Sequence, residues 1–134
     1  MPKHKVAVIE DNDINMKLVK TLLDLAGFDV VAAEDAETGI DMIREHRPDL
    51  ILMDMQLPGM DGLSATKIIK QDEALKSIPV VALTSYSMQG DEERADQAGC
   101  SGYISKPIDT RNFAKNVNQY IGSNTNADVP TELA

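Results

Sequence analysis

Three acidic side chains follow the apolar runs of this chain at positions where they could do chemistry. Glu10 and Asp11 come directly after the run at 6–9, and Asp54 comes directly after the run at 50–53. Acidic residues contribute little to a hydrophobic core. If the two runs are neighbouring strands, the three carboxylates converge on one pocket.

Such a pocket needs a compensating positive charge. Two like unit charges about 4 Å apart repel by about 4 kcal/mol at an effective dielectric constant near 20. A hard divalent cation with a preference for oxygen ligands offsets this repulsion. Lys106 follows a third apolar run and adds an ammonium group. These residue types predict a metal-assisted site with a carboxylate nucleophile.

Composition limits the classes of function that remain. The chain has 134 residues, a hydrophobic fraction of 43% and a formal net charge of -9. This length suits one domain, and the acidic balance disfavours nucleic acid, which basic residues bind. No apolar stretch approaches the roughly 18 residues of a membrane span. The single cysteine, Cys100, has no internal disulfide partner. We therefore expect a cytoplasmic protein with no nucleic-acid partner and no membrane insertion.

Apolar runs and helical patterns alternate along the chain. Short runs rich in β-branched residues predict strands, and apolar residues at helical spacing, ended by glycine, predict helices. The expected strands are 6–9, 29–33, 50–53, 79–84 and 102–105. The expected helices are 12–26, one capped by Asp35 with Ala36, Ile40 and Ile43 on one face, one with Leu63, Ala65, Ile68 and Ile69 inward, 91–98, and one capped by Asp109 with Phe113, Val117, Tyr120 and Ile121 inward. Gly122 is expected to end the last helix, and 123–134 to form a flexible tail.

Alternation of this kind predicts an α/β fold with a parallel sheet and helices on both faces. Ligand sites in such sheets lie at the carboxyl ends of the strands. Thr84 ends the fourth expected strand and Lys106 follows the fifth. The acids and these two residues therefore belong to one edge of the sheet.

Four segments together resemble the receiver domains of two-component response regulators. They are Val-Ile-Glu-Asp-Asn at 8–12, Asp-Leu-Ile-Leu-Met-Asp-Met-Gln-Leu-Pro-Gly-Met-Asp-Gly at 49–62, Val-Val-Ala-Leu-Thr-Ser at 80–85 and Tyr-Ile-Ser-Lys-Pro-Ile at 103–108. The resemblance covers about residues 5–121. Segments 12–18 and 87–94 are similar to the DivK type of single-domain cell-cycle regulator. The resemblance implies a receiver domain at 1–122.

The resemblance implies a flavodoxin-like, doubly wound sheet of five parallel strands in the order 2-1-3-4-5. It also implies Mg²⁺ as the cofactor, with Mn²⁺ as the alternative. Asp11 and Asp54 then bind the ion directly, the backbone carbonyl of Gln56 is a further ligand, and Glu10 acts through water.

By the same resemblance, Asp54 is the phosphoacceptor and Lys106 neutralises the transferred group. Thr84 donates its hydroxyl to a phosphoryl oxygen, and Tyr103 is the switch aromatic that rotates behind it. The bond before Pro107 is expected to be cis, because such bonds are essentially confined to proline. The product is an acyl phosphate that forms with the help of the receiver's own site and that water removes slowly from it, so the chain is a signalling phosphoacceptor rather than an enzyme.

Some of these residues also have purely structural interpretations. Asp11 or Asn12 could simply cap the first helix, and Tyr103 could be a half-buried strand residue with a solvated hydroxyl. Asp61 is interpreted as a solvated acid in a loop or as the cap of the third helix. These interpretations do not explain why the acids, Thr84 and Lys106 all lie at the carboxyl ends of four expected strands.

Three other functions compete with the receiver. A phosphohydrolase that forms an aspartyl phosphate needs a second aspartate two residues after the nucleophile, where this chain has Gln56. A flavin-nucleotide carrier needs a phosphate-binding loop after the first strand, where this chain has Glu10 and Asp11. A pseudo-receiver, used as a docking module without phosphorylation, is the remaining alternative.

The expected partners are proteins. A histidine kinase or a histidine phosphotransfer protein donates the phosphoryl group, and a downstream regulatory protein reads the phosphorylated form in a bacterial phosphorelay. Since only twelve residues follow the last expected helix, we expect output through the surface of the fourth helix, the fifth strand and the fifth helix rather than through a DNA-binding domain.

Overall fold

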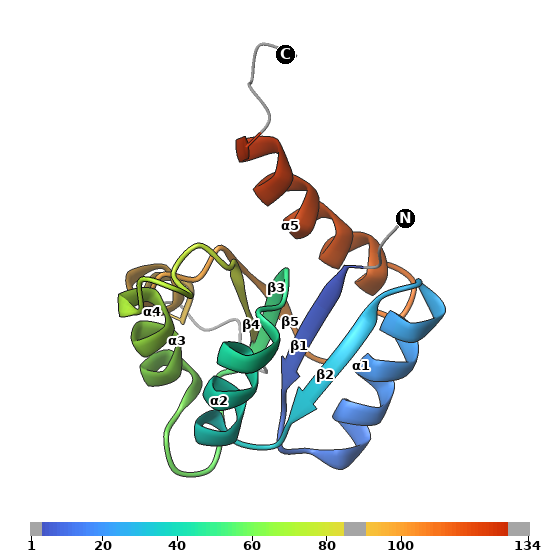
Figure 1. Ribbon diagram of the computed structural model, residues 1–134. Helices are drawn as coiled ribbons and strands as arrows, with labels where there is room; N and C mark the ends of the chain where they lie inside the picture. Colours follow the sequence, from blue (N-terminus) through green and yellow to red (C-terminus); the bar gives the residue numbers. More distant parts are fainter. Residues whose placement is uncertain (1–3, 85–90, 129–134) are drawn as a thin grey trace.

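Parallel strands build the centre of the protein, and helices cover both faces of their sheet. The computed structural model describes residues 4–84 and 91–128. In this part of the chain the sheet has five strands in the order β2-β1-β3-β4-β5, as Figure 1 shows. The strands are β1 (Lys5–Ile9), β2 (Asp29–Ala33), β3 (Leu50–Asp54), β4 (Val80–Thr84) and β5 (Gly102–Ser105). The expected fold class and strand order are confirmed.

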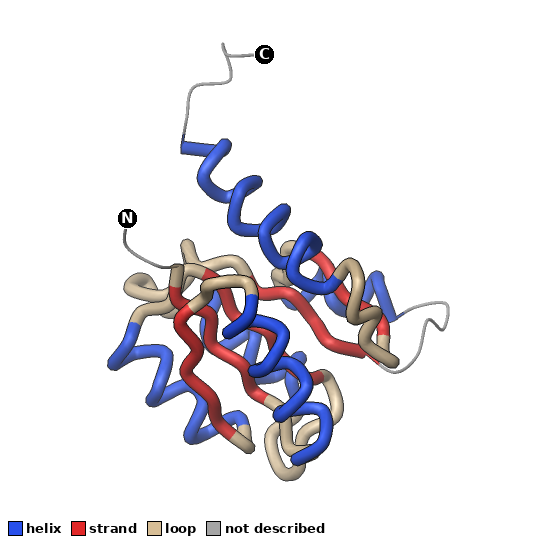
Figure 2. Tube along the Cα trace, turned by 90° about the vertical axis from the view of Figure 1, so that its right-hand side faces the viewer, coloured by secondary structure: helices blue, strands red, loops and turns tan. Residues whose placement is uncertain are grey.

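The helices fall into two layers, one on each face of the sheet (Figures 1 and 2). Their bounds are α1 (Asp13–Leu25), α2 (Ala36–His46), α3 (Gly62–Gln71), α4 (Asp91–Ala98) and α5 (Phe113–Asp128). One buried cluster joins the sheet to α2, α3 and α4, and a second joins it to α1 and α5. Within β1, Val6 and Val8 face the second cluster whereas Ala7 and Ile9 face the first. Burial on both faces explains why the inner strands β1, β3 and β4 are continuous apolar runs.

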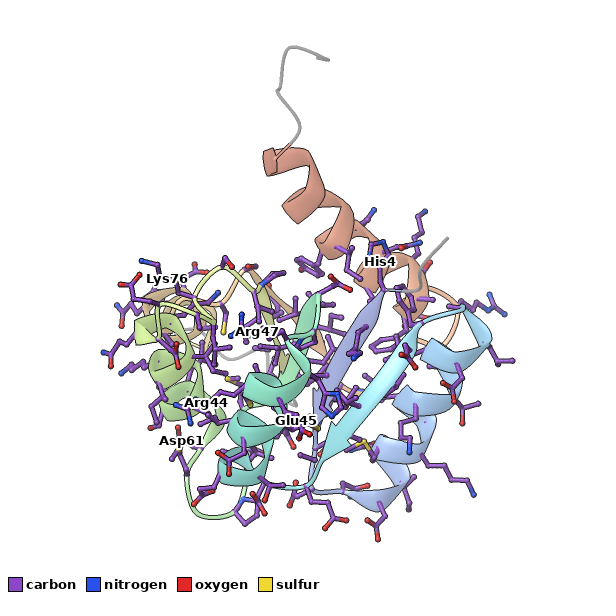
Figure 3. All side chains as sticks on the ribbon, in the orientation of Figure 1. His4, Arg44, Glu45, Arg47, Asp61 and Lys76 are labelled. Atoms are coloured by element: carbon purple, nitrogen blue, oxygen red, sulfur yellow. The ribbon has the colours of Figure 1, made fainter. Side chains whose placement is uncertain are left out.

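Side-chain caps begin three of the helices, as their sequences suggest. Asn12 Oδ1 accepts a hydrogen bond from the Asn15 N–H at 2.9 Å, and Asp35 Oδ1 accepts from the Thr38 N–H at 2.7 Å. Asp61 lies at the start of α3 (Figure 3), and its Oδ1 accepts from the Ser64 N–H at 2.7 Å. Each cap satisfies a backbone donor that the first helical turn leaves unpaired. Asn12, not Asp11, therefore caps α1, and the cap of this helix does not explain Asp11.

The last helix differs from the sequence expectation at both ends. It begins at Phe113, so Asp109 lies in the preceding turn, where its Oδ1 accepts from the Arg111 N–H at 3.1 Å. The expectation that Gly122 ends the helix is wrong, because α5 continues to Asp128. A glycine inside a helix costs only about 1 kcal/mol relative to alanine, which does not by itself end a helix. Figure 1 shows this end of α5 extending past the sheet. The part of the expected tail at 129–134 lies outside the described residues.

The apolar pattern of α1 also overstates how much of it is buried. Val19 and Leu23 are fully buried, but Ile14 is 79% exposed. Periodicity identifies the side of a helix that faces the core and does not show how far along the helix the core reaches. Over the described residues, the helices are too short or too polar to cross a bilayer.

Candidate functional site

The strand register brings the acidic residues to one edge of the sheet. β1 and β3 are adjacent and parallel, and Ile9 is paired with Met53. Glu10 and Asp54 therefore follow at the same level, on neighbouring strands. Carboxylate oxygens of Glu10, Asp11 and Asp54 all lie within 4.8 Å of one another. The convergence expected of these three residues is confirmed.

Lys106 reaches the same cluster from the far side of β4. The register pairs Thr84 with Ser105, and the Lys106 N–H donates to the Thr84 carbonyl at 2.7 Å. The Lys106 ammonium lies 2.7 Å from Glu10 Oε1 and 3.3 Å from Asp54 Oδ2. The Lys106–Pro107 bond is cis, as expected. Residues from three strand ends thus meet in one site.

The acids of the cluster differ sharply in exposure. Glu10 is 1% exposed and Asp54 is 3% exposed, whereas Asp11 faces solvent. Asp54 Oδ1 accepts a hydrogen bond from the Gln56 N–H at 3.0 Å, and Glu10 Oε2 accepts from the Asn12 N–H at 3.2 Å. Backbone N–H groups just beyond the two strands thus hold both buried carboxylates. The cluster is accessible to solvent on the side of Asp11.

The environment of Asp54 disfavours its charged form. Burial, together with a hydrogen bond to Glu10 and the negative charge of Glu10, raises the pKa of Asp54 from its ordinary value of 3.8 to about 6. The Gln56 N–H and the Lys106 ammonium lower it only in part. A carboxylate with a raised pKa in such a cluster is a mark of a functional site.

This raised pKa predicts a pH-dependent stability in the absence of divalent ions. Because the folded-state pKa lies above the unfolded value of 3.8, Asp54 costs no stability below pH 3.8, and the cost grows as the pH rises through about 6. This difference between the pKa of Asp54 in the unfolded and folded states corresponds to a free energy of unfolding of about 3 kcal/mol. Urea unfolding of wild type and Asp54→Asn should therefore diverge from near zero at pH 4 to roughly 2–3 kcal/mol at pH 7.5, with the variant more stable. A gap that stays constant over this range contradicts the assigned environment.

The donor set fits a hard divalent cation. Carboxylate oxygens suit Mg²⁺ and Mn²⁺, and Asp11 provides access from solvent. Glu10 Oε1 is buried and has no well-directed hydrogen bond from a described group, although the Lys106 ammonium is 2.7 Å away. A metal-bound water is the kind of donor that this oxygen lacks. The residues present therefore match the expected cofactor.

Thr84 and Tyr103 occupy places consistent with their expected roles. Thr84 is the partly buried last residue of β4, beside Lys106. Tyr103 is 36% exposed on β5 and stands opposite Ala82 in β4. Their roles as hydroxyl donor and switch aromatic stay predictions, as does the ligand role of the Gln56 carbonyl.

An open cavity of about 270 Å³ lies on the Tyr103 side of the protein, between β5 and α5. Tyr103, Pro107, Phe113 and Tyr120 are among the residues that line it. The Tyr120 hydroxyl donates to the Tyr103 carbonyl at 3.4 Å and so covers part of the sheet edge. Tyr120 packs against the core on the inward face of α5, as its spacing in the sequence predicts, but no motif marks its contact with Tyr103, which depends on how α5 docks.

Gly62 is the first residue of α3, and it lies close to the acceptor strand. A Cβ at this position would lie 2.2 Å from the Asp54 carbonyl oxygen and 2.9 Å from Met55 Cα. The start of α3 is therefore packed directly against the backbone that carries Asp54, which requires the absence of a side chain.

Known proteins are similar to this chain over most of its length. The family model described as the response regulator receiver domain matches residues 6–118. The polar-differentiation response regulator DivK of Brucella anthropi is 48% identical over 122 residues, which are 91% of this chain and 98% of the relative.

Solved structures agree with this comparison. The receiver domain of sensor histidine kinase PA1611 from Pseudomonas aeruginosa PAO1, described with a magnesium ion coordinated in its active site cleft, is 32% identical with a TM-score of 0.83. That match covers 90% of this chain and 99% of the other. A signal receiver domain of a histidine kinase from Syntrophus aciditrophicus is 26% identical with a TM-score of 0.81, over 90% of this chain and 91% of the other.

Proposed function

The chain belongs to the response regulator receiver domain family, and from this premise we propose that it accepts a phosphoryl group on Asp54. The observation that carries the proposal is the meeting of Asp54 with Glu10, Asp11 and Lys106 at one edge of the sheet. The donor is a phosphohistidine of a histidine kinase or a phosphotransfer protein. The chain thereby acts as a signalling phosphoacceptor.

In this reaction an Asp54 carboxylate oxygen attacks the phosphorus of the donor. A bond forms between this oxygen and phosphorus, the bond between phosphorus and the donor imidazole breaks, and the imidazole takes up a proton. Phosphoryl transfer depends mainly on positioning and on neutralisation of charge. Lys106 contributes positive charge at the reacting oxygens, and the Gln56 N–H orients the acceptor through Oδ1.

Mg²⁺, with Mn²⁺ as the alternative, supplies charge neutralisation at the phosphoryl oxygens when bound. Asp11 and Asp54 are the residues that would hold it, with the Gln56 carbonyl as a further ligand and Glu10 acting through water. The similar receiver domain of PA1611, which has a magnesium ion coordinated in its active site cleft, supports this assignment. Water later removes the phosphoryl group slowly at the same site, so the signal is temporary.

The test of this proposal is a mass measurement. Protein incubated with acetyl phosphate and Mg²⁺ should gain the mass of one phosphoryl group, because Asp54 is the acceptor and the cation offsets the charge of the acidic cluster. The same incubation with EDTA should give no gain. Absence of the gain with Mg²⁺, or an equal gain with EDTA, contradicts the proposed metal-dependent transfer.

We propose that phosphorylation is read on the face formed by α4, β5 and α5. Thr84 would turn toward the phosphoryl group and Tyr103 would follow it inward, which biases a two-state surface. The name of the Brucella relative supports a place in a phosphorelay of the DivK cell-cycle type. A pseudo-receiver is not supported, since the acceptor, the acids and the lysine are all present and in contact. Such a relay is cytoplasmic, and so we propose this location for the chain.

This switch predicts a partner that discriminates between the two forms. Because the phosphoryl group changes the populations of the two surface states, a downstream regulator should bind phosphorylated protein several-fold more tightly than unmodified protein. Calorimetry of one partner with both forms measures the ratio. Equal affinities rule out this face as a phosphorylation-dependent output.

A further inference from the structure

The buried polar side chains of the protein are few, and one of them lies outside the acidic site. Among the residues that the structure describes, three polar or charged side chains are buried, and two of these are Glu10 and Asp54. The third is Thr66, which is fully buried in the middle of α3. A buried hydroxyl is costly unless it is hydrogen-bonded. The partners of Thr66 therefore show what its hydroxyl holds in place.

The Thr66 hydroxyl is bonded to the start of its own helix. Its Oγ1 donates to the Gly62 carbonyl at 2.7 Å, one helical turn earlier. Gly62 is packed so closely on β3 that a Cβ there would lie 2.2 Å from the Asp54 carbonyl oxygen. A movement of the first turn of α3 is therefore passed to the backbone that carries Asp54. The hydroxyl of Thr66 fixes the position of this turn.

The same hydroxyl contacts the turn between α4 and β5. The Cys100 thiol is hydrogen-bonded to the Thr66 side chain. A hydroxyl has one proton, and Thr66 directs it to Gly62, so the thiol is the donor in this second bond. The Cys100 N–H donates to the Ala95 carbonyl at 2.9 Å and closes the last turn of α4. Thr66 thus joins the start of α3 to the end of α4.

A continuous face of α3 makes this connection. α3 and α4 lie side by side (Figure 1). One turn beyond Thr66, the Lys70 stem lies against the end of α4, since a Cβ at Gly99 would be 2.7 Å from Lys70 Cγ. Gly62, Thr66 and Lys70 are spaced four residues apart and so share one side of the helix. This side extends from the Asp54 backbone to the α4–β5 turn.

We propose that Thr66 is a positioning residue for phosphoryl transfer. It holds the backbone of Asp54 in place through Gly62, and it ties this backbone to the α4–β5 turn through Cys100. The inference rests on the proposed function, because it adds a residue outside the acidic cluster to the same reaction. Transfer depends on accurate placement of the attacking oxygen. A small displacement of the backbone beneath the carboxylate therefore lowers the rate.

Thr66→Val tests the bond to Gly62, because it removes the hydroxyl and keeps the shape of the side chain. A methyl carbon approaches an oxygen to about 3.3 Å at closest, so it cannot replace a hydroxyl at 2.7 Å without a shift of the first turn of α3. We expect about a fivefold slower gain of phosphoryl mass from acetyl phosphate and Mg²⁺. Thr66→Ser keeps the hydroxyl and loses the methyl, and its rate should stay within about twofold of wild type.

Ile69→Val is the matched structural control. Ile69 is fully buried on α3, so the loss of one methylene lowers stability but leaves the hydroxyl of Thr66 in place. All rates are compared without denaturant, on variants whose circular dichroism shows a folded protein. A wild-type rate for Thr66→Val, or the same slowing in Thr66→Ser or Ile69→Val, overturns the proposal. If Thr66→Val does not fold, Thr66→Ala takes its place: it differs from Thr66→Ser by the hydroxyl alone, and equal rates for these two variants overturn the proposal.

Alkylation of Cys100 tests the second contact without a phosphodonor. Cys100 is the single cysteine of the chain, so the mass that iodoacetamide adds reports on this thiol. Thr66→Val leaves the thiol without its acceptor, and we expect alkylation several-fold faster than in wild type, whereas Thr66→Ser and Ile69→Val stay near wild type. Equal alkylation rates in Thr66→Val and wild type overturn the tie to the α4–β5 turn. This measurement remains valid if wild type gains no phosphoryl mass, a result that would refute the acceptor role of Asp54 instead.

Discussion

Replacement of Asp54 by asparagine is expected to abolish phosphorylation by acetyl phosphate in the presence of Mg²⁺. The amide has nearly the same shape as the carboxylate but lacks the nucleophilic oxygen, and its oxygen can still accept from the Gln56 N–H. Loss of a nucleophile typically lowers the rate by on the order of 10³-fold or more. Intact-mass measurement over time compares the phosphorylated fraction of the variant with that of wild type.

Asp61→Asn is the matched control for this experiment. Asp61 is an exposed acid seven residues further along the chain, and it caps α3 through its Oδ1. Asparagine is an equally good cap, so both the fold and the phosphorylation rate should be retained. Undiminished phosphorylation of Asp54→Asn would show that another group is the acceptor.

Substitution of Gly62 by alanine is expected to destabilise the protein and slow phosphorylation together. Alanine normally stabilises a helical position by up to about 1 kcal/mol relative to glycine. Here its Cβ would lie 2.2 Å from the Asp54 carbonyl oxygen, so α3 or the end of β3 must move. We expect a loss of about 2–3 kcal/mol in urea unfolding and a slower gain of the phosphoryl mass, because the shift reaches the acceptor.

Gly39→Ala distinguishes this effect from general crowding. Gly39 is also a buried helical glycine, but its added Cβ would meet the end of the Ile9 side chain at 2.8 Å rather than backbone. A side chain can rearrange more easily than a backbone carbonyl. The control should lose less stability and keep its phosphorylation rate. Equal losses of phosphorylation in both variants would remove the specific link between Gly62 and Asp54.

The fold and the acidic cluster could be predicted because their signals are local in sequence. Runs such as 50–53 are buried on both faces and bounded by turns, so they identify strands without knowledge of their neighbours. Each acid stands directly after such a run, which places it at the carboxyl edge of the sheet. The resemblance to receiver domains then supplied the order of strands, which sequence periodicity alone does not determine.

The remaining features depend on contacts between distant elements. The continuation of α5 to Asp128 was missed because a glycine permits a helix end without requiring one. The high exposure of Ile14 reflects how far along α1 the core extends. The close contact of Lys106 with Glu10 depends on the rotamers of two side chains 96 residues apart, about which sequence patterns carry no information.

The central claim, that Asp54 accepts the phosphoryl group, is tested most directly by borohydride reduction of phosphorylated protein followed by peptide mass mapping. Borohydride converts an aspartyl phosphate to homoserine, which marks the acceptor in the sequence. We predict homoserine at position 54 when phosphodonor and Mg²⁺ are both present, and unmodified aspartate when Mg²⁺ is removed. Homoserine at Asp11 or at another acid, with Asp54 unmodified, would contradict the account.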